Sequence, residues 1–261
     1  MEEIKNVRWQ DGAIASARGG PAFGWRWFII VILWSATAYA APAWKDIADG
    51  LQYKKVNVSP AGFIHFFKID PAKLKLKIIT AKEFGMINID AKSMAQKSGS
   101  IAAVNGGFFT PEYASLGLLV KDGREISRLK WTSWWHIFQI ASGKPRVITK
   151  QDYKFTPEIE MAIEAGPRIL VDGSVPSGLK QSAAERTAIG IAEDSGIILA
   201  ITESLPITLS DFAVHLLNIG CKDALNLDGG SSTQVYAKAK GFELYRNGFG
   251  PVANGIGVFP R

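Results

Sequence analysis

Hydrophobic and polar residues alternate along much of the chain, which is the pattern of β-strands with one buried face. Residues 73–78 alternate strictly and residues 56–69 alternate loosely, with an Asp70-Pro71 turn between them. Further strands are expected at 101–104, 116–120, 169–171, 187–192 and 197–202. Asp-Gly or Asp-Ser-Gly turns follow several of these segments, so we expect hairpins and antiparallel pairing.

Two segments have helical patterns instead. Asp90 can cap a short helix over 91–97 that Gly99 ends. Residues 209–219 carry one apolar stripe, with Ser210 as the expected cap and Gly220 as the end. The pattern therefore predicts an α+β fold, with a mainly antiparallel or mixed β-sheet, a few short helices and a single catalytic domain. We place that domain at 53–261, after a polar linker at 41–52.

The first 40 residues resemble a targeting segment. An arginine at position 26 precedes a short apolar stretch at 28–33, and Ala38-Tyr39-Ala40 matches a cleavage site. The apolar stretch is short for a membrane span of about 20 residues. We expect a signal peptide cleaved after Ala40 and a periplasmic or secreted protein. If the segment is retained, we expect it to anchor the protein to the membrane through residues 25–38.

The chain has a net charge of +6, and its basic residues are spread along the sequence rather than gathered in a basic arm. Such a charge suits an anionic envelope surface or a phosphorylated glycan. Export and the lack of a basic-aromatic stripe argue against a nucleic-acid partner. The single cysteine, Cys221, leaves no intramolecular disulfide and is interpreted as a structural thiol.

Several kinds of chemistry lack their motifs in this sequence. There is no phosphate loop of the G-x-x-x-x-G-K-[ST] type, no G-x-G-x-x-G and no G-x-S-x-G. His65, His136 and His215 do not have metal-ligand spacing. No cofactor is predicted with certainty. Ca²⁺ is the one cation considered, bound by Asp228, Asn105 and backbone carbonyls, although no acidic calcium loop is present.

Four glycine-flanked polar motifs remain, each of which is also consistent with a simple tight turn. They are Asn105-Gly106-Gly107-Phe108-Phe109, Ala165-Gly166-Pro167-Arg168, Arg186-Thr187-Ala188-Ile189-Gly190 and Asn226-Leu227-Asp228-Gly229-Gly230-Ser231-Ser232. The last follows an apolar strand, and its two glycines leave the backbone open to a ligand. Successive N–H groups there can bind an anion. This context favours a binding site over a plain turn.

These motifs, in this order, resemble those of the phosphodiester glycosidases over roughly residues 56–259. The Asn-Leu-Asp-Gly-Gly string is the specific one, whereas the closing motif at 252–258 is weak. Many members have a third glycine where this chain has Ser231. The resemblance implies a hydrolase that cleaves the bond between sugar C1 and a phosphodiester oxygen. It implies a GlcNAc-1-phosphodiester-like substrate in envelope or exopolysaccharide material.

Within that reaction, Asp228 is the candidate carboxylate for the sugar carbon, as nucleophile, as base on water or as stabiliser of the positive transition state. A phosphate leaves as a stable anion, so a fixed cation can replace the usual acid. Arg186 is the first candidate for that cation and Arg168 the second. Asn105 either holds a sugar hydroxyl or orients Asp228. The remaining expected substrate contacts are Gly106, Gly107, Gly229, Gly230, Ser231 and Ser232.

Other residues are secondary candidates. Glu164 and Glu185 are reserve acids, each expected to be a surface charge. The tryptophan-rich segment 131–135 can stack on sugar rings or pack in the core. The alternative function is a non-catalytic module that binds envelope glycan or assists exopolysaccharide assembly.

Overall fold

The computed structural model describes residues 43–59 and 62–261, in which the strands form three sheets and every strand pair is antiparallel. The largest sheet has seven strands in the order β1-β2-β3-β13-β12-β14-β11. Its strands are β1 (Lys45–Ala48), β2 (Leu51–Asn57), β3 (Phe63–Ile69), β13 (Ile197–Glu203), β12 (Thr187–Ala192), β14 (Cys221–Asn226) and β11 (Arg168–Leu170). Together with the two helices described below, the sheets confirm the α+β prediction.

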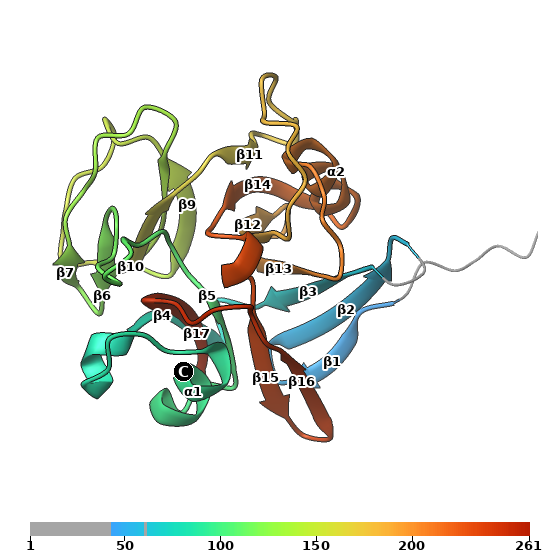
Figure 1. Cartoon of the computed structure of the whole chain (residues 1–261), viewed down its shortest axis with the longest axis horizontal. Coiled ribbons are helices and arrows are strands. Elements are labelled where there is room, and N and C mark those ends of the chain that lie inside the picture. Colours follow the sequence, from blue (N-terminus) through green and yellow to red (C-terminus); the bar gives the residue numbers. More distant parts are fainter. Residues whose placement is uncertain (1–42, 60–61) are drawn as a thin grey trace, which may run out of the picture. The chain divides into compact units, whose positions relative to one another are not determined.

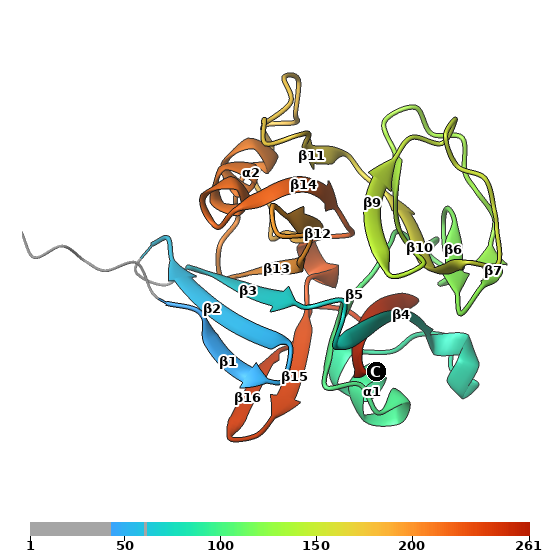
Figure 2. The ribbon, with the colours of Figure 1, turned by 180° about the vertical axis from the view of Figure 1, so that it is seen from behind.

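Two five-stranded sheets complete this part of the chain (Figures 1 and 2). One has the order β7 (Arg124–Ser127), β6 (Leu119–Lys121), β10 (Ile159–Ala165), β8 (His136–Ala141) and β9 (Lys144–Ile148). The other has the order β16 (Phe242–Arg246), β15 (Val235–Ala239), β5 (Ala102–Asn105), β17 (Asn254–Pro260) and β4 (Leu74–Thr80).

The helices are short and lie against sheet faces. Helix α1 (Ala91–Ser98) contacts β15 and β5, and α2 (Leu209–Asn218) contacts β14 and β11 (Figure 1). As expected, Asp90 caps α1 by accepting a hydrogen bond from the Ser93 N–H at 2.9 Å. The Ser210 cap predicted for α2 is wrong. Thr208 caps that helix through the Asp211 N–H at 3.1 Å, because the helix already begins at Leu209.

Two short 3₁₀ helices, η1 (Ala81–Phe84) and η2 (Gly230–Ser232), lie between strands. One apolar core is shared by all three sheets, with Ile69, Ile78 and Met161 each contributing from a different one. A second cluster fills the space between α2 and the seven-stranded sheet. The apolar stripe of α2 faces this cluster through Leu209, Phe212, Ala213 and Leu216, whereas Leu217 is exposed.

The linker predicted at 41–52 is a second correction. Strand β1 and the beginning of β2 occupy residues 45–52 and form a hairpin at the edge of the seven-stranded sheet. Its Ile47 and Leu51 side chains are buried in the shared core. Charged neighbours mask this short alternation in the sequence, and Gly50 supplies the left-handed turn at φ 77°.

Other expected strands are present. The hairpin of 187–192 with 197–202 is confirmed, with Thr187 opposite Ile201. The predicted targeting segment lies outside the described residues. In the part of the chain that the structure describes, no helix is long and apolar enough to cross a membrane.

Candidate functional site

The loop that follows β14 lines a pocket of about 420 Å³. Residues 226–230 form one side of it, and Phe108 and Trp134 contribute aromatic surface. The two largest hollows in the described part of the chain, of about 850 and 790 Å³, lie elsewhere and are bordered by lysine–carboxylate pairs such as Lys73–Asp49 and Lys121–Glu83. Neither contains a residue of the four motifs. The smaller pocket is therefore the candidate site, and its volume suits a small ligand.

Asp228 is the carboxylate of this pocket. Its Oδ1 accepts a hydrogen bond from the Gly229 N–H at 2.9 Å, and the Ser232 side chain also bonds to it. Burial raises the pKa of the Asp228 carboxyl, and these two hydrogen bonds oppose the rise. Among the described residues, Asp228 is the one acidic side chain that lines the pocket.

Asn105 orients the loop of residues 226–232, which we call the Asp228 loop. This side chain is fully buried at the end of β5, and its Nδ2 donates to the backbone oxygen of Asp228 at 2.6 Å. Its Oδ1 accepts from the Thr187 hydroxyl at 2.8 Å and from the Gln234 N–H at 3.1 Å. Of the two roles considered for Asn105, the contacts support orientation of Asp228, since the amide is occupied by protein groups.

Gly106 and Gly107 allow two backbones to approach each other beneath the loop. The backbone oxygen of Gly106 accepts from the Asp228 N–H at 3.1 Å. A methyl group at Gly106 would lie 2.3 Å from Asn254 Oδ1, and that oxygen accepts from the Gly107 N–H at 2.8 Å. Both glycines were predicted to contact substrate. In the structure both glycines donate hydrogen bonds to Asn254, and Gly106 also accepts one from Asp228. Neither glycine lines the pocket.

Gly229 and Gly230 both line the pocket. The Gly230 N–H donates to the backbone oxygen of Glu185 at 2.7 Å, and Gly230 has φ 58°. Ser231 is exposed, and its backbone oxygen accepts from the Phe249 N–H at 2.9 Å. Ser232 is buried beside Asp228, so of the two serines it is the one that contacts the carboxylate.

Of the two predicted arginines, the structure brings Arg186 to the pocket. Its Nε donates to the backbone oxygen of Ile207 at 3.1 Å and its Nη2 to that of Ser182. Burial lowers the pKa of the Arg186 guanidinium, so an anion beside it would offset part of the cost of its desolvation. Arg168 is outside the pocket, with its guanidinium paired to Asp223.

Sequence reasoning missed a second cation, Lys180, which lines the pocket and is exposed. It lies in the loop between β11 and β12, in a segment without a recognisable motif. The sequence predicted that the segment 131–135 can stack on sugar rings, but not that Trp134 and Phe108 line the pocket together. Phe108 meets Trp134 edge-on, with ring centroids 6.5 Å apart, and stacks on Trp135 at 5.1 Å.

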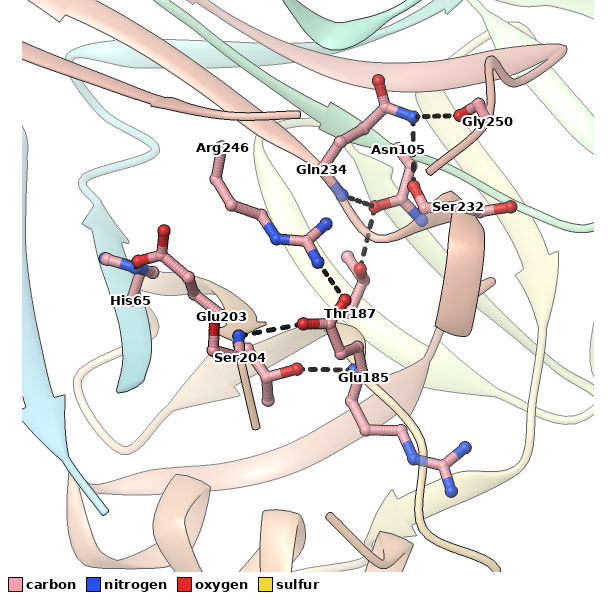
Figure 3. A network of polar contacts seen from close by, with 12 residues as sticks. His65, Asn105, Glu185, Thr187, Glu203, Ser204, Ser232, Gln234, Arg246 and Gly250 are labelled. Carbon is pink, nitrogen blue, oxygen red and sulfur yellow. Dashed lines mark hydrogen bonds and ion pairs between the residues drawn. The ribbon is translucent and has the colours of Figure 1, made fainter. Parts of the chain in front are cut away.

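The two reserve acids are not surface charges, which corrects the prediction. Glu164 is fully buried, and its Oε2 accepts from the N–H groups of Leu118 and Lys130 at 2.9 and 2.8 Å. Glu185 is largely buried, pairs with Arg246 and accepts from the Ser204 N–H at 2.9 Å. Figure 3 shows this ion pair close to the Asn105–Thr187–Gln234 network.

Within residues 43–59 and 62–261, no group of three or more His, Cys, Asp or Glu side chains is arranged to hold a metal ion. The lone Cys221 is buried, and burial raises its pKa to about 12. His215 is half-buried on α2, as expected of a boundary residue.

Comparison with known proteins agrees with this arrangement. A family model of the phosphodiester glycosidases matches residues 98–259, which is more than half of the chain. The chain belongs to the phosphodiester glycosidase family. The matched range includes Asn105, Arg186 and the whole Asp228 loop.

Individual relatives are distant. The uncharacterized protein YigE of Escherichia coli (strain K12) is 24% identical over 148 residues, which cover 52% of this chain and 58% of YigE. The chain thus spans little more than half the length of that relative.

Two solved structures share the fold. The catalytic domain of zebrafish N-acetylglucosamine-1-phosphodiester alpha-N-acetylglucosaminidase, auto-inhibited by its pro-peptide, has a TM-score of 0.62 at 14% identity, covering 86% of this chain and 85% of that one. A hypothetical protein from Synechocystis has a TM-score of 0.57 at 17% identity, covering 85% of this chain and 64% of that one.

Proposed function

We propose that this chain hydrolyses the bond between sugar C1 and a phosphodiester oxygen. The proposed substrate is a GlcNAc-1-phosphodiester-like group in envelope or exopolysaccharide material. The observation that carries the proposal is the pocket, where the Asp228 carboxylate shares one cavity with two cations and an aromatic side. Family membership supports the same reaction class.

Asp228 acts on the sugar carbon in this proposal. The Gly229 N–H and the Ser232 side chain hold the carboxylate in place, and Asn105 fixes the backbone that carries it. As an ionised group it can attack C1, take a proton from water or stabilise the oxocarbenium-like transition state. Because its pKa is raised, the ionised form is lost at a higher pH than for an ordinary aspartate.

The phosphate binds near Lys180 and Arg186. Glycosidases usually need a second carboxyl group to protonate the leaving oxygen. A phosphate leaves as an anion with a second pKa of about 6, so stabilisation by fixed cations can replace that proton. The single carboxylate among the described lining residues fits a reaction with this leaving group.

The choice of sugar follows the zebrafish protein of similar fold, an N-acetylglucosamine-1-phosphodiester alpha-N-acetylglucosaminidase. The proposed location is the periplasm or the outside of the cell, with membrane anchoring if residues 25–38 are retained. This part of the proposal rests on the targeting pattern in the sequence.

The test is an assay of the purified protein on the methyl ester of α-GlcNAc-1-phosphate and on UDP-GlcNAc, with detection of reducing sugar and with chelator in parallel samples. We expect wild-type protein to release GlcNAc.

Asp228→Asn should lower kcat by about a thousandfold or more. The asparagine Oδ1 can still accept from the Gly229 N–H, so folding should be preserved. Unchanged turnover in the variant would remove Asp228 from the chemistry. Glycan binding without release would favour the non-catalytic alternative.

A further inference from the structure

The loop between β7 and β8, residues 128–135, is held by two buried charged side chains of opposite sign. We call it the tryptophan loop, because it carries Trp131, Trp134 and Trp135. Lys150 Nζ donates to the backbone oxygens of Thr132 and Trp135, the second at 3.0 Å. Glu164 Oε2 accepts from the Lys130 N–H at 2.8 Å.

Burying these charges is unfavourable, because neither joins an ion pair among the described residues. Lys150 is 5% exposed and Glu164 is 0% exposed. The second carboxylate oxygen of Glu164 has no hydrogen-bond partner. Lys150 bonds to the backbone of the tryptophan loop alone, whereas Glu164 bonds to the backbone of this loop at Lys130 and to the Leu118 N–H beside it. The buried charges therefore fix the conformation of the loop and tie it to the neighbouring segment.

The fixed loop presents aromatic surface to solvent. Trp131 is 71% exposed and Trp134 is 49% exposed, whereas Trp135 is buried beneath them. Trp134 stands at 88° to Trp135, with centroids 5.7 Å apart, and it also lines the pocket. The exposed surface of Trp134 is therefore continuous with the candidate site, and Trp131 lies three residues before it in the same loop. Aromatic rings at such a position favour a ligand with flat apolar faces, such as a pyranose ring.

The basic residues near the exposed tryptophans favour a ligand that carries negative charge. Arg128 and Lys130 precede the exposed Trp131 in the same loop and are themselves exposed. At the pocket, Lys180 and Arg186 repeat this pairing of cations with aromatic surface. A ligand that alternates sugar rings with negative charges would match both places at once.

We propose that the tryptophan loop binds the continuing chain of a glycan whose sugars are joined through phosphodiesters. Trp131 and Trp134 stack on successive pyranose rings, and Arg128 and Lys130 bind the phosphate between them. The substrate is then a polymer rather than a single glycosyl phosphodiester. This inference rests on the proposed function for the position of the cleaved bond.

The test measures binding by calorimetry to protein with the Asp228→Asn substitution, so that turnover does not interfere. The probes are an oligomer of GlcNAc-1-phosphate units joined through phosphodiesters, the single methyl phosphodiester unit, an uncharged GlcNAc oligomer and an oligothymidylate. We expect the charged oligomer to bind most tightly. Adding Trp131→Ala should reduce its preference over the single unit about tenfold, the loss of one stacked ring. Because Trp131 is exposed, folding should not suffer.

Tyr245→Ala is the matched control. Tyr245 is also exposed, but it packs beside Tyr236 and Lys92 of α1. We expect this variant to keep the preference for the charged oligomer. An unchanged preference in Trp131→Ala, or tighter binding of the oligothymidylate, would overturn the inference. Failure of the proposed function looks different: wild-type protein would then release no sugar from the single unit, while oligomer binding still depended on Trp131.

Discussion

The Asp228 loop and the tryptophan loop line the same pocket, but different contacts hold them. The Asp228 loop is fixed through backbone groups and small residues, with Asn105 and Glu185 as its main partners. The tryptophan loop is fixed by buried charges that donate to or accept from its backbone. The first arrangement leaves no room for a side chain at Gly229, whereas the second leaves Trp131 and Trp134 exposed. We infer that the first sets the chemistry and the second sets what is bound.

The sharpest test of this contrast is a pair of glycine variants in the Asp228 loop. In Gly229→Ala, the new methyl group would lie 2.7 Å from the backbone oxygen of Glu185. That oxygen cannot easily move, because it also accepts from the Gly230 N–H. We expect the free energy of unfolding to fall by about 3 kcal/mol, with a large loss of activity.

Gly230→Ala is the matched comparison. Nothing lies within 4 Å of the added methyl group, but the residue has φ 58°. The cost should be the smaller one of left-handed backbone, about 1–2 kcal/mol. Chemical denaturation of both variants measures the difference. Equal losses would show that the close approach to Glu185 does not hold the loop.

For the tryptophan loop, Lys150→Met removes the donor to two backbone oxygens. We expect a loss of about 2 kcal/mol in unfolding free energy and weaker binding of the charged oligomer. Lys154→Met, at an exposed lysine of the same loop between β9 and β10, should stay within about 0.5 kcal/mol of wild type. If both variants bind the oligomer as wild type does, Lys150 does not position the loop.

The smallest effect is expected from Glu164→Gln, and it depends on pH. Burial raises the pKa of Glu164 above its unfolded value, so the folded state binds this proton more strongly. Stability from this group is present at low pH and is lost as pH rises through the folded pKa. A glutamine removes that loss, so the Tm of the variant relative to wild type should rise from acidic to neutral pH. A constant difference would mean that Glu164 does not titrate as described.

The two loops also differ in how far the sequence predicted them. The Asp228 loop was recognisable because the structure requires glycine at two adjacent positions. Gly229 lies close to the Glu185 backbone and Gly230 has a left-handed conformation, so the pair appears in the sequence as a motif. Lys150 and Glu164 left no such signal, because a charged residue in a strand or turn is usually exposed. Lys180 was missed because an exposed lysine in an irregular loop resembles any other surface charge. The hairpin at 187–202 was predictable, since its pairing is local and its turn is marked.

The most direct test of the account is the position of bond cleavage. Wild-type protein should hydrolyse an α-GlcNAc phosphodiester in ¹⁸O-labelled water, and the products should be analysed by mass spectrometry. We expect the label to enter the C1 hydroxyl of the released sugar, since the proposed role of Asp228 is to direct attack at that carbon. Label in the phosphate, or no release of sugar at all, would contradict it.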